Sequence, residues 1–379
     1  MEFYRAGAES SRLFSVIVPK KANILFIYEL EKGGNGMKRG RAWCGRLAFF
    51  FPFAALSVVY AVTARDPEAA LRLDRAVGAP LRALLSTALR PIPFSVTEWL
   101  LVSLPAVLLL SVPLAFLSAK SASATRRAVA LLLLPTVTVM GLYVLTFAAG
   151  RHTPPIEERL ALPAEAAPTA EEIVSTAAWL SALSADPPDY PGAAAVEAAL
   201  VCAYRGAGER YGFTANAAVA VKTTATPLFL RLGYFGLYAF PLGEVTVTAE
   251  CPPSTRTFTL AHEIAHASGF AREEEADLIA LLTALSSADP YLTYAVAEGI
   301  LGRFLSCLAV ENPAVWQEIS QGLSSAAREG LFEAGEVFEG AQAAETVAAE
   351  TPDYSKTIRL TVALYRRISA QGAGGASIL

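Results

Sequence analysis

The sequence predicts a mainly α-helical membrane protein, in which three membrane-spanning helices precede a helix-rich globular domain with a small β-sheet. Of its 379 residues, 54% are hydrophobic and 17% are charged, and the mean hydropathy is +0.41, which is too apolar for an ordinary soluble enzyme. Three apolar runs of spanning length precede residue 150, and later apolar positions follow helical periodicity. The formal net charge of −4 gives no basic field, so we expect no nucleic-acid partner.

The N-terminal residues 1–36 are expected to be an extension that is either untranslated in the cell or disordered. Their apolar part is interrupted by Pro19, Lys20 and Lys21, which leaves no run long enough to span a bilayer. The first span is predicted at residues 47–64. Four basic residues precede it: Lys38, Arg39, Arg41 and Arg46.

The second and third spans are predicted at residues 99–118 and 128–149. The loop between them, residues 119–127, is short and basic, as is the flank before the first span, so we expect both in the cytoplasm and the chain after the third span outside it. The expected domains are a membrane domain (37–150), an extracytoplasmic globular domain (151–370) and a flexible tail (371–379).

A helix is predicted between the first two spans, at residues 68–89. Leucines and valines recur along one side of it, and arginines are interspersed. This pattern suits a helix that lies on the membrane surface, and it suits equally a helix packed on the globular domain. Both interpretations stay open.

The globular domain is predicted to be mostly helical. Residues 169–183 and 193–211 follow helical periodicity, and the chain after Pro290 is helical with breaks at Pro313 and Pro352.

One strand is predicted at residues 243–248, after the aromatic stretch 234–238. An edge strand at this place can hold an extended peptide by strand addition, which makes Val245, Thr246 and Val247 candidate substrate-binding residues. A plain hairpin strand without a ligand is the alternative.

The stretch from Thr257 to Ala280 contains the candidate metal ligands and the candidate general base. His262, Glu263 and His266 stand in HExxH order, and residues four apart share one face of a helix, so the two imidazoles can converge on a zinc ion. Glu263 lies about 100° further round the helix, beside an open coordination position, where a general base is needed. Zinc lowers the pKa of a bound water to roughly 7, so this carboxylate can take its proton.

A third ligand is expected in the acidic cluster that follows. A helix that ends near Gly269 and a second that starts near Arg272 form an αα-hairpin, in which Glu273 can reach back towards His266. Asp277 follows four residues later on the same face and is placed to orient a ligand histidine. Glu274 is the alternative ligand, and Glu275 is expected to face solvent.

The segment from His262 to Asp277 resembles the motifs of known protein families. The segment HEIAHASGFAREEEAD resembles the signature of a bacterial family of membrane proteins of unknown function, HExxH-x-x-G-F-x-x-E-x-E-A-[ND]. The element from Glu273 to Asp277 is also similar to the third-ligand element of the HtpX and CAAX prenyl protease group and of the ImmA/IrrE peptidases. The resemblance implies a zincin-like domain of the gluzincin kind in a bacterial cell membrane, with His262, His266 and Glu273 as zinc ligands and Glu263 as the base.

The expected function is therefore that of a membrane-anchored zinc metallopeptidase with a peptide or protein substrate. A catalytically inactive zinc-binding module of the envelope, for assembly or sensing, is the alternative, and a transporter or scaffold is a further one. His152 is expected at the membrane interface rather than on the metal. Five tyrosines are candidate donors to a tetrahedral intermediate, with no means of choosing among them: Tyr234, Tyr238, Tyr291, Tyr294 and Tyr354.

Overall fold

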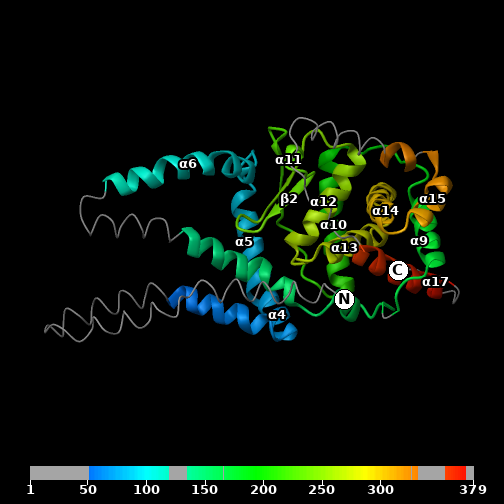
Figure 1. Ribbon diagram of the computed structural model, residues 1–379, viewed down its shortest axis with the longest axis horizontal. Coiled ribbons are helices and arrows are strands. Elements are labelled where there is room, and N and C mark those ends of the chain that lie inside the picture. The colour runs from blue at the N-terminus through cyan, green and yellow to red at the C-terminus, as the bar shows by residue number, and fades with distance from the viewer. Residues whose placement is uncertain (1–50, 119–134, 165, 326, 332–354, 373–379) are drawn as a thin grey trace. The chain divides into compact units, whose positions relative to one another are not determined.

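Two buried helices, α12 (Pro253–Ala267) and α13 (Glu273–Ser286), form the centre of the fold (Figure 1). Every residue of α12 from Thr257 onward is buried, and a helix buried on all sides belongs to the core. The helix predicted to end near Gly269 is confirmed, because α12 ends at Ala267.

The computed structural model describes residues 51–118, 135–164, 166–325, 327–331 and 355–372. The extension 1–36 and the tail after residue 372 lie outside the described residues.

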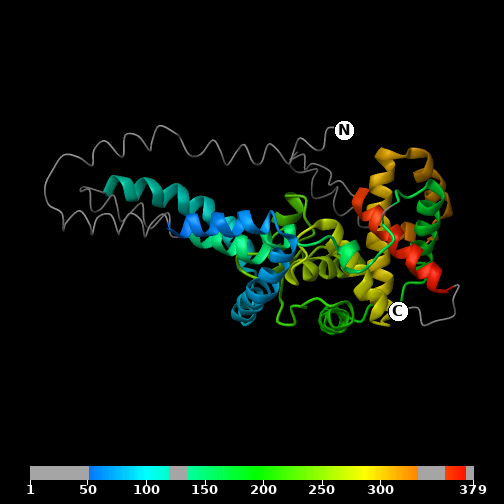
Figure 2. The same ribbon diagram turned by 90° about the horizontal axis from the view of Figure 1, so that it is seen from below.

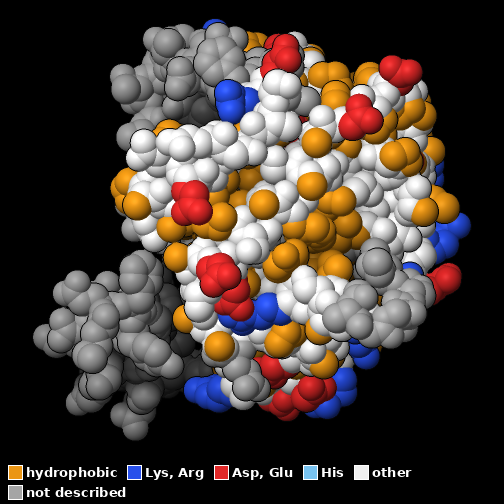
Figure 3. Space-filling model, turned by 90° about the vertical axis from the view of Figure 1, so that its right-hand side faces the viewer, with side chains coloured by type: hydrophobic (Ala, Val, Ile, Leu, Met, Phe, Trp, Pro, Cys, Tyr) orange, Lys and Arg blue, Asp and Glu red, His pale blue; other side chains and the backbone are white. Residues whose placement is uncertain are grey.

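Further helices pack around this pair and confirm the predicted helical domain. They are α9 (Ala170–Leu183), α10 (Ala193–Tyr211), α14 (Pro290–Glu311), α15 (Pro313–Gly322) and α17 (Ser355–Gly372). Thr169 and Glu172 form a capping box that fixes the start of α9. Helix α9 lies beside both α15 and α17 (Figures 1 and 2). Figure 3 looks onto this side, where apolar side chains are interspersed with acidic and basic ones.

A three-stranded sheet packs against α12. It consists of β1 (Ala220–Thr223), β2 (Gly236–Ala239) and β3 (Glu244–Val247), in the order β1-β3-β2. β3 pairs in parallel with β1 and antiparallel with β2. The predicted strand is thus present, but the expectation that it is an edge strand is wrong. Both sides of β3 are already paired, so Val245, Thr246 and Val247 cannot hold a peptide by strand addition.

The helical stretch between the first two predicted spans packs on the globular domain. It comprises α4 (Pro67–Leu73), a π-helical turn η1 (Asp74–Gly78) and α5 (Ala79–Leu89). Its buried side carries Asp74, Arg82 and Ser86, whereas Val77 and Leu84 are exposed. The side that contacts the protein therefore includes polar residues, and part of the apolar stripe faces outward.

The described parts of the predicted spans are helical except at their last residues, 64 and 149. Residues Phe51–Thr63 are helical, α6 covers Val96–Ser118, and residues 135–143 are helical before a π-helical turn, η2 (Val144–Ala148). The apolar helices that they contain, Phe51–Thr63 and Val96–Val107, are shorter than the 18 residues required of a candidate membrane span.

The described helix long and apolar enough to cross a membrane is Pro290–Ala309 of α14. Because 61% of its most apolar stretch is buried inside the protein, it packs as a core helix.

Buried carboxylates join α6 to the sheet. Glu244 of β3 accepts hydrogen bonds from the backbone N–H groups of Val96 (3.1 Å) and Thr97 (2.9 Å), at the start of α6. Glu98 in turn accepts from the N–H groups of Ala225 (2.7 Å) and Thr226 (2.8 Å). Residues Leu56–Leu379 accordingly belong to one compact unit, and the domain boundary expected at residue 150 falls inside it.

Candidate metal centre

The end of α12 fixes the orientation of His266. The N–H of Phe270 bonds to the carbonyl of Ala265 (3.1 Å) and the N–H of Gly269 to that of His266 (3.0 Å), which is a Schellman motif. Gly269 has φ +103°, a conformation that L side chains rarely adopt. The turn brings the Phe270 carbonyl oxygen to 2.6 Å from Nδ1 of His266. Nδ1 therefore carries the proton, and the Nε2 lone pair is free for a metal.

His262 is oriented from α13. Its Nδ1 lies 2.8 Å from Oδ1 of Asp277, a carboxylate that is fully buried. This is the place expected for Asp277, one turn after Glu273. A histidine that donates from Nδ1 to a carboxylate presents Nε2 as the ligand atom.

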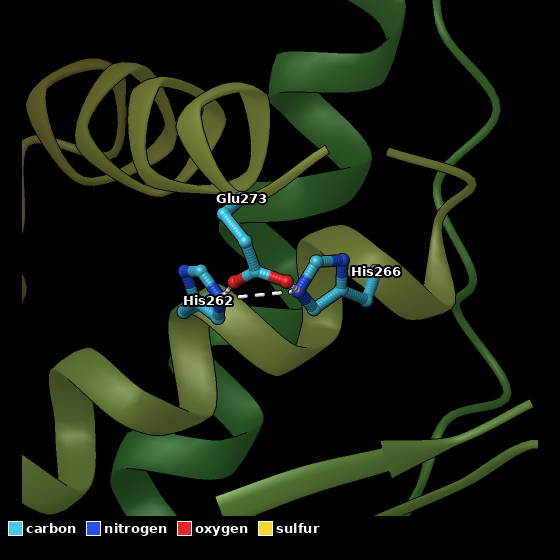
Figure 4. A group of neighbouring side chains, drawn as sticks. All are labelled: His262, His266 and Glu273. Atoms are coloured by element: carbon cyan, nitrogen blue, oxygen red, sulfur yellow. Dashed lines mark hydrogen bonds and ion pairs between the residues drawn. The ribbon is translucent and has the colours of Figure 1, made fainter. Parts of the chain in front are cut away.

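The ligand atoms of His262, His266 and Glu273 converge within 4.8 Å of one another. The two Nε2 atoms lie 3.0 Å apart, and the Glu273 carboxylate oxygens are 3.1 Å from Nε2 of His262 and 3.6 Å from Nε2 of His266 (Figure 4). Tetrahedral ligands at about 2.0–2.1 Å from one zinc ion are about 3.3–3.4 Å apart. The observed separations lie on both sides of this value, so the donor set fits zinc.

The carboxylates also set the charge of the site. Burial and the nearby Arg303 lower the pKa of His262, but hydrogen bonds to Asp277 and Glu273 raise it more, to about 9. Partial burial opposes ionisation of Glu273, yet His262 and His266 outweigh it and hold the pKa of Glu273 well below its usual range. The Glu273 side chain is 61% exposed. A cation can therefore approach the donors from solvent.

The other acidic residues of the segment lie outside this donor group. Glu263 is buried next to His262 in α12, and its carboxylate forms no hydrogen bond or ion pair with the described residues. Glu274 lies 3.8 Å from Nζ of Lys356. The expectation that Glu275 faces solvent is wrong. It is 2% exposed and accepts hydrogen bonds from the N–H of Ile156 (3.0 Å) and from Arg272 (2.5 Å).

The family model described as "Protein of unknown function (DUF3810)" matches residues 76–353, which is more than half of the chain. The chain belongs to this family. No curated protein and no solved structure matches it. The DUF3810 match covers the segment from His262 to Asp277 and the helices on both sides of it.

Two residues that support the site in this DUF3810 protein were not found from the sequence. Nε of Arg303 on α14 lies 3.2 Å from Oδ1 of Asp277, and the Thr357 hydroxyl on α17 donates to Oδ2 (2.9 Å). The guanidinium of Arg303 also lies over the ring of Phe258. A lone arginine in an apolar helix was the available signal for Arg303, whereas Thr357, 80 residues from Asp277, had none.

The candidate transition-state donors within the described residues are not brought to the donor group. Tyr291 and Tyr294 interact with Thr257 and Ser254, at the opposite end of α12 from His266. Tyr238 is buried near Arg82, and burial raises the pKa of its phenol. Tyr234 is exposed, and Tyr354 lies outside the described residues. His152 packs edge-on against Tyr60 and is separate from the donor group.

Proposed function

We propose that the protein is a membrane-anchored zinc metallopeptidase, in which His262, His266 and Glu273 hold the metal and Glu263 is the general base. The observation that carries this proposal is the convergence of the three ligand atoms within 4.8 Å. Two imidazole nitrogens and one carboxylate oxygen form a donor set typical of catalytic zinc. Both histidines are also held by partners on Nδ1, as ligand histidines are.

In the proposed reaction, the metal and the side chains would have different roles. Bound zinc would supply Lewis acidity and lower the pKa of a water molecule. The Glu263 carboxylate accepts a proton from the water that attacks the peptide carbonyl and passes it to the leaving amine. Its position suits this role because it follows His262 directly and is not itself among the converging donors.

The membrane anchor is supported by the distribution of exposed apolar side chains. Among the described residues, the large hydrophobic side chains that are exposed lie between residues 51 and 140, with four exceptions. The exceptions are Tyr190, Leu232, Tyr234 and Trp316. Apolar surface that gathers on a few helices indicates contact with lipid or protein. We infer that the helices at 51–63, 96–118 and 135–148 belong to three spans, with the site outside the cytoplasm.

Replacement of the proposed base tests the function. In zinc-loaded full-length protein, Glu263→Gln should keep the metal and lower the rate of peptide hydrolysis by about 10²- to 10⁴-fold, because amide oxygen is a poor base. Mass spectrometry of a peptide library incubated with the protein measures cleavage, and zinc analysis of the same sample measures the metal. Glu274→Gln is the matched control and should cleave normally. Wild-type cleavage by Glu263→Gln would refute the mechanism.

A further inference from the structure

An apolar stripe leads along the third predicted span towards the metal donors. Val139 and Met140 are 44% and 40% exposed. Tyr143 and Phe147 follow at spacings of four residues from Val139, so they continue the same face of the helix. Their rings lie 6.1 Å apart between centroids, and both side chains are half-buried.

The stripe ends against a ligand histidine. The ring of Phe147 lies 6.2 Å from that of His266. Phe240, which follows β2, completes the group, with its ring 5.2 Å from Tyr143 and 5.8 Å from Phe147. We call Tyr143, Phe147 and Phe240 the aromatic cluster. It comes from two elements that are distant in sequence and meet beside the donor group.

The aromatic cluster is not simply part of the core. Tyr143 and Phe147 lie outside the main hydrophobic core of the protein, and all three side chains keep part of their surface exposed. The π-helical turn η2, which carries Phe147, is a kind of irregularity found frequently at functional sites. An apolar surface that is continuous with exposed Val139 and Met140, and that stops at a metal donor, suits an apolar ligand lying across it.

We propose that the aromatic cluster binds a large apolar side chain of the substrate, next to the peptide bond that is cleaved. This proposal rests on the proposed peptidase function. The substrate class is then a peptide segment rich in apolar residues, which the stripe from Val139 to Phe147 guides to the donors. The continuity of the stripe with His266 carries the assignment, because a side chain seated there has its backbone within reach of the metal.

Two hydroxamates of different size test the proposal on the zinc-loaded full-length protein in detergent. Acetohydroxamate reaches only the metal, whereas the hydroxamate of 4-phenylbutyric acid adds an apolar arm. The arm should increase affinity in the wild type by about 10-fold or more, as expected for burial of an aromatic side chain. Phe240→Ala should remove most of this gain and leave the affinity for acetohydroxamate unchanged. Isothermal titration calorimetry measures both affinities.

Controls separate the possible failures. Trp316→Ala removes an exposed aromatic ring from α15 and should leave both affinities unchanged. Tyr143→Ser provides a second variant if Phe240→Ala does not fold. If acetohydroxamate fails to bind the wild type, the peptidase function itself fails and this proposal with it. If acetohydroxamate binds but both cluster variants keep the full gain from the arm, the cluster is packing or lipid-covered surface only, and this proposal alone is overturned.

Discussion

Arg82 lies where the helices before residue 150 meet the end of α12. Its side chain is 1% exposed, and its guanidinium donates to Asp74 (2.6 and 3.1 Å) and to the carbonyl of Thr146 (2.8 Å). A Cβ atom on Gly269 would lie 2.5 Å from Nη2 of Arg82, so only glycine fits at that turn. The ion pair between Arg82 and Asp74 therefore packs against the turn that orients His266.

Removal of this arginine is predicted to destabilise the protein strongly. Arg82→Met leaves Asp74 buried without its partner, which costs about 3–5 kcal/mol. Thermal unfolding in detergent should show a clear fall in Tm. Arg72→Met, which removes an arginine whose side chain is 69% exposed, should change little. The double variant Asp74→Leu with Arg82→Met should recover part of the loss, because no buried charge is left. An unchanged Tm in Arg82→Met would contradict this account.

At the residue scale, the sequence supported predictions where spacing along one helix, or a short turn between two helices, decides the geometry. His262 and His266 converge because they are four residues apart, and Asp277 lies one turn after Glu273 for the same reason. Glu275 was misplaced because its burial depends on the N–H of Ile156, 119 residues away. Partners at such separations leave no local pattern.

At the scale of the elements, helix α17 contributes a residue to the site that could not be identified from the sequence. Its Thr357 hydroxyl donates to Asp277 (2.9 Å), which accepts from His262 in turn. Arg303 on α14 contacts the same carboxylate. The orientation of His262 thus depends on three helices, α13, α14 and α17.

Thr357→Val is predicted to weaken zinc binding by about 10- to 100-fold, because loss of a partner behind a ligand histidine has effects of this size. Thr357→Ser keeps the hydroxyl and should restore the affinity. Thr361→Val is the matched control, since Thr361 is buried one turn later and its hydroxyl donates to the backbone carbonyl of Thr357 in the same helix. Competition with a chromophoric chelator measures the affinities. If Thr357→Val and Thr361→Val bind zinc equally well, the role assigned to Thr357 is wrong.

Helices with a long periodic pattern could be predicted from the sequence. The place of a strand within the sheet could not, because it depends on pairing with other strands. α9 and α10 are long enough for a helical pattern to identify them. The alternation in β3 indicated a strand but could not show that β1, only four residues long, pairs with its free side. The leucine-rich stripe of the 68–89 helix could not decide between the membrane surface and the globular domain, because the burial of Arg82 and Asp74 depends on their pairing with each other.

At the scale of the whole molecule, the helices before residue 150 and the globular domain form one unit. Glu244 and Glu98 fasten the start of α6 to the sheet, and β3 packs on α12. Exposed apolar side chains are concentrated on the helices before residue 150, for example at Leu109 (76%) and Leu110 (66%). A membrane that covers these helices would hold the metal centre at a fixed distance from its surface.

Membrane integration is predicted for the full-length chain. Spanning helices are not released by alkaline carbonate, because their removal exposes about 20 apolar residues each to water. When the chain is expressed in bacteria, immunoblotting should therefore find it in the membrane pellet after carbonate treatment. A peripheral protein of the same membranes, released by the treatment, provides the control. Release of the chain into the supernatant would contradict the proposed spans.

The zinc content of the purified full-length protein tests the central claim most directly. The account predicts about one zinc ion per chain in the wild type and in Glu274→Ala, and loss of the metal in His262→Ala and Glu273→Ala. Metal-free wild-type protein that takes up no zinc would contradict it. Retention of zinc by Glu273→Ala together with its loss from Glu274→Ala would contradict the ligand set.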